Sequence, residues 1–148
     1  MGGVLLAAAF TAWSEERCAI ARDADFAGEG RWRLERYLER LARTSGGAYG
    51  IQPQEFRLLI SNASPPLVGG HPVGGEIGCS WGKRYVSLYK QTLTNRTLAV
   101  TYNTIAREYF HHVQVRRDGV SCSSSVDGLA ALEAEARNWA RDVAPLCR

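Results

Sequence analysis

The stretch TIAREYFHHVQ, residues 104–114, contains the clearest grouping of side chains that could do chemistry. In a helix, Glu108 and His111 are three positions apart and therefore share one face. A carboxylate and an imidazole placed together can transfer protons or bind a metal ion. Arg107 lies on the same face, four residues before His111, and its permanently protonated guanidinium cannot coordinate a metal. His112 points about 100° away from His111, so we expect it to be a helix–core residue.

The C-terminal segment supplies a second carboxylate. A helix is predicted from about Val126 to Val143, with Asp127 as a candidate N-cap. Its apolar seam recurs at alternating spacings of four and three residues: Leu129, Glu133, Ala136, Ala140 and Val143. A carboxylate on a buried seam is costly unless a cation or a metal pairs with it. A seam that is only partly buried would instead let Glu133 reach solvent, and both interpretations stay open.

Together the two segments resemble the gluzincin class of HExxH zinc metallopeptidases. In that motif, histidines at i and i+4 bind zinc and the glutamate beside the first is the general base. REYFHHVQ is similar to the HEYGHHVQ signature of the bacterial neutral zinc metallopeptidases, and EAEA is similar to their third-ligand segment ELxAD. The resemblance covers roughly residues 31–143, including the order helix, strand, edge strand, motif helix and third-ligand helix.

The resemblance implies that His111 is a zinc ligand, Glu108 the general base and Glu133 the third ligand. Three positions depart from the family pattern: Arg107 replaces the first ligand, Phe110 a small residue and Arg137 an aspartate. Arg107 could satisfy Glu133 with a bidentate pair and so supply the charge that a metal supplies in the enzymes. We therefore predict a structural Arg107–Glu133 pair, a vestigial base, vestigial ligands and no bound cofactor. Arg137 could pair with Glu108 or point to water.

The function predicted from these features is that of a pseudoenzyme. It would bind a protein or peptide partner, or serve as a subunit of a larger assembly. The strand with Tyr85, Ser87 and Tyr89 would be the receiving edge, because an extended peptide can add to an exposed sheet edge. The alternative is an active zinc-dependent metallopeptidase with a rearranged ligand set. For that alternative, His71 lies in a glycine-rich loop that could bend over the site.

The helices and strands that must position these residues are predicted from the spacing of apolar side chains. Their order indicates an α+β domain with a small sheet. Helices are predicted over about 4–21, 31–43, 98–115 and 126–143, and strands over 55–63 and around 85–89, with a glycine-rich loop at 67–78. One apolar stripe marks the third helix: Tyr102, Ile105, Tyr109 and Val113. We predict a single domain, 1–148, with a helical extension at 1–30 and a zincin-like core at 31–143.

Composition limits the classes of partner. The 148 residues are 45% hydrophobic and 22% charged, which is ordinary for a globular domain. A net charge of +3, with 18 Lys and Arg interleaved with 15 acids, disfavours nucleic-acid binding. The apolar run at 4–13 is shorter than the roughly 20 residues that span a bilayer, so no membrane span is predicted. That run is either a signal-peptide core without its basic residues or a packed first helix.

Four cysteines bear on the compartment: Cys18, Cys79, Cys122 and Cys147. We predict bridges between Cys79 and Cys122 and between Cys18 and Cys147, although spacing alone does not determine connectivity. Two bridges and the apolar N-terminus favour an exported protein, whereas unpaired thiols would suit the cytoplasm. The sequence does not indicate an oligomeric state.

Overall fold

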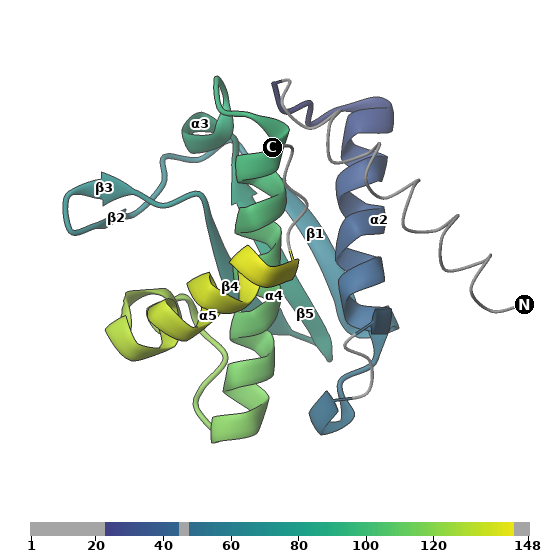
Figure 1. The fold of residues 1–148 in the computed structure, drawn as a ribbon, viewed down its shortest axis with the longest axis vertical. Helices are drawn as coiled ribbons and strands as arrows, with labels where there is room; N and C mark the ends of the chain where they lie inside the picture. The colour runs from purple at the N-terminus through teal and green to yellow at the C-terminus, as the bar shows by residue number, and fades with distance from the viewer. Residues whose placement is uncertain (1–22, 45–47, 144–148) are drawn as a thin grey trace, which may run out of the picture.

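The computed structural model describes residues 23–44 and 48–143 and has the predicted α+β architecture (Figure 1). Its helices are α2 Gly28–Thr44, α3 Lys90–Leu93, α4 Leu98–Asp118 and α5 Ala130–Val143. Its strands are β1 Phe56–Ser61, β2 Leu67–Val68, β3 His71–Pro72, β4 Gly75–Ser80 and β5 Lys83–Tyr89. Short 3-10 helices are η1 Ala48–Gly50, η2 Pro53–Glu55 and η3 Ser124–Gly128. The helix predicted at 4–21 and the Cys18–Cys147 bridge lie outside the described residues.

A three-stranded sheet in the order β1-β5-β4 forms one layer of the domain. β1 runs parallel to β5, and β4 runs antiparallel to it. Trp81 and Gly82 join β4 to β5 with positive φ angles of 51° and 73°, as a type I′ turn requires. β2 and β3 form a separate two-stranded hairpin that projects from the domain (Figure 1).

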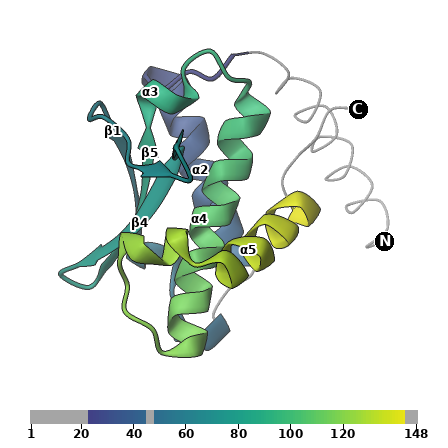
Figure 2. The same cartoon turned by 90° about the vertical axis from the view of Figure 1, so that its left-hand side faces the viewer.

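The helices pack in two further layers. α2 and α4 lie against one face of the sheet, and α5 crosses α4 on the side away from the sheet (Figure 2). The predicted stripe on α4 is confirmed as core, since Tyr102, Ile105, Tyr109 and Val113 are all buried. Ala136 and Ala140 of α5 are also fully buried, and their small side chains let α5 approach α4 closely. Leu129 is 49% exposed, so the predicted seam is wrong at its first position.

The glycine-rich segment is more regular than predicted. Its second half is β4, where the register pairs Gly75 with Leu88 and Gly78 with Tyr85. A Cβ added to Gly75 would lie 2.9 Å from the Ser87 carbonyl oxygen and 3.0 Å from Glu108 Cγ. Gly75 is therefore needed for the close approach of β4 to α4. The prediction of a loop at this position took glycine as a sign of irregular structure and did not consider this contact.

β4 also changes the role of β5. With β1 on one side and β4 on the other, β5 is the central strand, so the prediction that Tyr85, Ser87 and Tyr89 form a receiving edge is wrong. Tyr89 is only 7% exposed, and its hydroxyl donates a hydrogen bond to Glu76. The outer strands of this sheet are β1 and β4.

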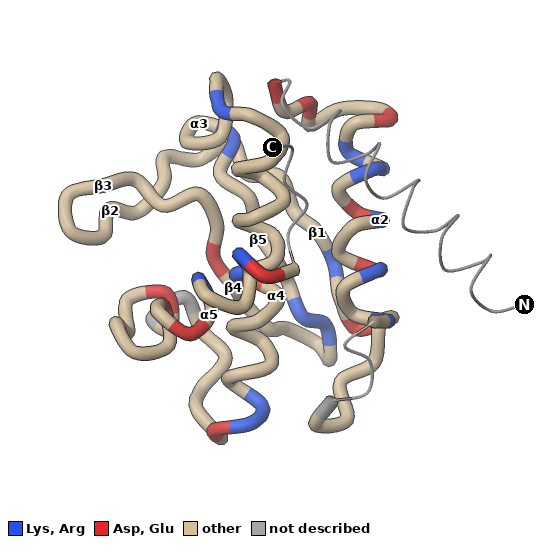
Figure 3. The backbone as a smooth tube through the Cα atoms, in the orientation of Figure 1, with Lys and Arg blue, Asp and Glu red and all other residues tan. Residues whose placement is uncertain are grey.

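Charges on the surface alternate in sign. Along α2, basic and acidic positions follow one another, as Figure 3 shows. Exposed pairs of spacing i,i+4 join Arg31 to Glu35 at 2.9 Å and Arg43 to Glu39 at 2.7 Å. None of the helices within 23–44 and 48–143 is long and apolar enough to cross a membrane.

Candidate functional site

α4 carries ionisable residues into the core, and two of them, Glu108 and His111, belong to the candidate site. The helix begins after Thr97, whose side chain accepts a hydrogen bond from the backbone of Val100, and ends at Gly119 in the left-handed conformation. Near its middle, Glu108 is 3% exposed and His111 is 0% exposed. Such burial requires partners for both side chains, because an isolated charge in the core is costly.

His111 is held through both ring nitrogens. Its Nδ1 lies 2.7 Å from Gln114 Oε1, and its Nε2 lies 2.6 Å from Glu133 Oε1 and 3.4 Å from Asp127 Oδ1. Burial alone would lower the pKa of His111, but the hydrogen bond to Glu133 and the charge of Asp127 outweigh it, so the pKa is raised. The same bond lowers the pKa of Glu133 against the effect of burial. His111 and Glu133 therefore form an ion pair in which the imidazolium donates through Nε2.

Asp127 and Glu108 face each other beside this ion pair. Burial raises the pKa of both carboxyls, and the proximity of Asp127 raises that of Glu108 further. The backbone N–H of Ile77 in β4 acts in the opposite direction on Asp127. Glu108 Oε2 and Asp127 Oδ2 are buried and accept no hydrogen bond from the described residues. The hydrogen bond between the two carboxyls raises the pKa of Glu108 and lowers that of Asp127, which favours a shared proton on Glu108. A cation could take the place of that proton.

We call Glu108, His111, Asp127 and Glu133 the carboxylate cluster. One potential ligand atom from each of Glu108, His111 and Asp127 lies within 4.8 Å of the other two, and Glu133 joins through its bond to His111. Residues from α4, η3 and α5 thus meet at one place. The sequence prediction brought Glu108, His111 and Glu133 to this site but did not include Asp127.

The predicted Arg107–Glu133 pair is absent from this cluster. No hydrogen bond or ion pair joins the two described side chains, and the buried Arg107 Nε has no hydrogen-bond partner. Glu133 packs against the His111 level of α4 instead, one helical turn from Arg107. The guanidinium still acts at a distance, because its charge contributes to the lowered pKa of Glu133 and offsets part of the rise at Glu108.

No family model, no curated protein and no solved structure matches the chain.

Two residues of the site were missed by sequence reasoning. Asp127 lies in η3 with its carboxylate buried, so it does not cap α5 as predicted. Gln114 is 0% exposed, and its amide nitrogen donates to Leu132 O at 2.9 Å and Glu135 Oε1 at 2.7 Å. A signal for Gln114 was present, because it follows His111 by three residues and must share its face.

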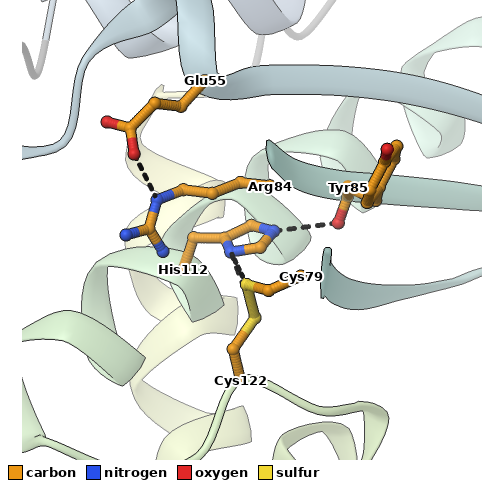
Figure 4. The surroundings of a disulfide bond; sticks show 6 residues. All are labelled: Glu55, Cys79, Arg84, Tyr85, His112 and Cys122. Carbon is orange, nitrogen blue, oxygen red and sulfur yellow. Dashed lines mark hydrogen bonds and ion pairs between the residues drawn. A yellow bond between two sulfur atoms is a disulfide. The ribbon is translucent and has the colours of Figure 1, made fainter. Parts of the chain in front are cut away.

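The second histidine of α4 has different surroundings. His112 is a fully buried core residue, as predicted, and its Nε2 lies 2.8 Å from the carbonyl oxygen of Tyr85. Its Nδ1 faces the disulfide between Cys79 and Cys122 (Figure 4). The presence of this disulfide confirms the predicted pairing of the two cysteines. Burial lowers the pKa of His112 to about 4, so its ring is neutral at physiological pH.

The remaining predicted residues lie outside the cluster. Phe110 stacks on Trp139 of α5 with ring centroids 4.9 Å apart, so its bulk fills the α4–α5 contact. Arg137 is exposed and lowers the pKa of Glu133 only through its charge. His71 is exposed in the β2–β3 hairpin and does not join the cluster.

Proposed function

We propose that this protein is a metallopeptidase-like, divalent-cation-dependent hydrolase in which Asp127 takes the place of the missing first histidine ligand. The observation that carries the proposal is the position of His111 Nε2, 2.6 Å from Glu133 Oε1 and 3.4 Å from Asp127 Oδ1. Ligand atoms at about 2.0–2.2 Å from a tetrahedral zinc lie roughly 3.3–3.6 Å from one another. The Asp127 separation already has that value, and the shorter one is a hydrogen bond that a cation would replace.

The charges of the site support this fit. With the shared proton on Glu108 and a protonated His111, the metal-free site would hold two negative carboxylates, Asp127 and Glu133, against the positive His111 and Arg107, a sum of zero. With a divalent cation, Glu108 and His111 give up their protons, and the three carboxylates, one guanidinium and the cation again sum to zero. Cation binding would therefore exchange for about two protons, as is usual for ligands that must deprotonate.

Each residue of the site would then have a separate role. His111, Asp127 and Glu133 would hold the cation, which supplies Lewis-acid activation of a carbonyl group or a water molecule. Glu108 would accept a proton, since a neighbouring cation favours the charged form of its carboxyl. Gln114 would orient His111 through Nδ1, in the way that outer hydrogen bonds fix metal-binding imidazoles.

A non-catalytic protein that binds a protein or peptide partner remains the second candidate. Arg107 favours it, because a fixed positive charge at the first ligand position reduces the affinity for any cation. A groove of about 720 Å³ between α2 and the outer strand β1 offers a place for such a partner. Its lining mixes apolar Leu38 and Leu59 with Arg31, Glu35 and Arg57.

The test is calorimetric titration of the metal-free chain with Zn²⁺ and Mn²⁺, with a generic peptide substrate assayed alongside. We expect one ion per chain, with release of about two protons measured in buffers of different ionisation enthalpy. Asp127→Asn should weaken binding by at least about tenfold. Asp118→Asn is the matched control, since it makes the same substitution at an exposed aspartate that binds Arg117 and lies outside the cluster.

Three outcomes separate the candidates. Binding with peptide hydrolysis supports the hydrolase. Binding without hydrolysis leaves a cation-stabilised protein that acts by binding a partner. Absence of binding at millimolar Zn²⁺ and Mn²⁺ would exclude the cation-dependent function and leave the second candidate.

A further inference from the structure

The bridge between Cys79 and Cys122 has an imidazole directly beside it. His112 Nδ1 lies 4.0 Å from Cys79 Sγ and 3.9 Å from Cys122 Sγ, so the nitrogen faces both sulfurs about equally (Figure 4). The three residues come from different elements, namely the end of β4, the loop before η3 and the middle of α4. This convergence takes no part in the carboxylate cluster.

The tautomer of His112 follows from its other nitrogen. Nε2 lies 2.8 Å from the carbonyl oxygen of Tyr85, which can only accept, so Nε2 must carry the proton. The neutral ring therefore presents the lone pair of Nδ1 to the sulfurs. A backbone carbonyl bound to the distal nitrogen is also the arrangement that holds metal-binding histidines in orientation.

We propose that Cys79, Cys122 and His112 form a second metal site, which takes a thiophilic ion such as Zn²⁺ when the bridge is reduced. The three ligand atoms lie within 4.8 Å of one another. A tetrahedral zinc with bonds of about 2.3 Å to sulfur and 2.0 Å to nitrogen needs ligand separations of roughly 3.5–3.8 Å. Once the S–S bond is broken, the sulfurs must separate, while each sulfur–nitrogen distance must shrink by only a few tenths of an ångström.

The chemistry balances with a dithiol as reductant. Thiolate attack on one sulfur breaks the bridge and releases the other sulfur as a thiolate, and the second thiol of the reductant completes the exchange. The protein then holds two thiols and the reductant a disulfide. Zn²⁺ displaces two protons from the thiols, and the His112 lone pair is already free.

Access favours this exchange. Cys79 is exposed and Cys122 is half-buried, so a reductant and an ion can reach the sulfurs, whereas His112 is fully buried. The fourth position of the ion would face solvent at the end of β4. The proposal is independent of the hydrolase function, because it shares no ligand with the carboxylate cluster.

Cobalt distinguishes the two sites, because only thiolate ligands give sulfur-to-cobalt charge-transfer absorption. The full chain with Cys18→Ser and Cys147→Ser would be titrated with Co²⁺, oxidised and after reduction by a phosphine, which does not compete as a thiol. We expect reduction to add one Co²⁺ per chain, with charge-transfer bands that Zn²⁺ abolishes. Asp127→Asn should leave these bands unchanged, even if it removes an ion from the cluster. No additional ion, or no charge-transfer bands, would overturn the proposal.

The role of the imidazole needs its own variant. His112→Gln keeps a donor for the Tyr85 carbonyl and removes Nδ1, so the affinity of the reduced chain should fall by at least about tenfold. Unchanged affinity in a folded variant would remove His112 from the ligand set. If the variant does not fold, the unmutated cobalt form decides. Ligation through Nδ1 predicts a hyperfine-shifted, exchangeable Nε2–H proton resonance, and its absence would contradict the assignment.

Discussion

His111 and His112 are neighbours on α4, yet they occupy opposite chemical environments. His111 is hydrogen-bonded to Glu133 and lies near Asp127, and its pKa is raised. His112 lies between a backbone carbonyl and a disulfide, and its pKa is lowered to about 4. Both side chains are 0% exposed, so burial alone does not explain the difference.

The turn of about 100° between consecutive residues of a helix explains it. One direction leads to the acids of η3 and α5, and the other leads to the sheet. The His111 region is therefore held together by charge, and the His112 region by a covalent bond and neutral contacts. The two regions should respond to different perturbations.

The largest effect is expected at the bridge. The double substitution Cys79→Ser and Cys122→Ser opens a loop of sequence separation 43, which should lower the free energy of unfolding by about 4 kcal/mol. Urea unfolding under non-reducing conditions measures this loss. The chain with Cys18→Ser and Cys147→Ser is the control, and phosphine treatment should cause a similar loss relative to its oxidised form. A change below about 1 kcal/mol would mean that the His112 region does not depend on its covalent bond.

A smaller effect should follow from changing the charge near His111. Arg107→His would place imidazoles at positions 107 and 111 and should raise the affinity for Zn²⁺ by about 100-fold, or roughly 3 kcal/mol, the share of one ligand in a four-ligand site. Calorimetry of both forms measures the change. Arg116→His makes the same substitution at an exposed position of α4 and should leave the affinity as it is. Equal affinity in the parent and the Arg107→His variant would show that the three ligands do not converge.

The smallest effect concerns Glu108. Burial and Asp127 raise its pKa above 4.5 in the folded chain, so the folded state binds its proton more tightly than the unfolded state does. Its contribution to stability is present at low pH and is lost as the pH rises from 4.5 through the folded pKa. Glu108→Gln cannot ionise, so the metal-free variant should be more stable than the parent at neutral pH, by about 1–3 kcal/mol.

That gain should disappear near pH 4, where both side chains are neutral. Thermal unfolding at a series of pH values in the presence of a chelator measures it. Glu135→Gln is the control with the opposite sign, because Arg117 lowers the pKa of that exposed carboxyl. A gain for Glu108→Gln that does not vary with pH would rule out ionisation as its cause.

The sequence predicted those parts of the fold that depend on periodicity. The stripe on α4 and the placement of Glu133 toward α4 follow from helical spacing, and the Cys79–Cys122 pairing was also correct. Spacing could not determine which residue of α4 contacts Glu133. That choice depends on the position of α5 along the axis of α4, where Ala136 and Ala140 form the contact. The role of Asp127 in the site was not predicted, because an aspartate is equally common as a helix N-cap and in a 3-10 turn. β4 was missed because Gly75 is required by its contact with α4, which no local pattern reveals.

The bridge between Cys79 and Cys122 also has a mechanical consequence. The segment that it closes contains all of β5 and α4, and therefore Glu108 and both histidines of α4. If the chain is pulled from its two ends, the oxidised protein can lengthen only outside this loop. The separation of 43 residues corresponds to about 150 Å of extended chain, which would be released only after reduction. Tension applied along the chain would therefore act directly on α4 only after the disulfide has been reduced.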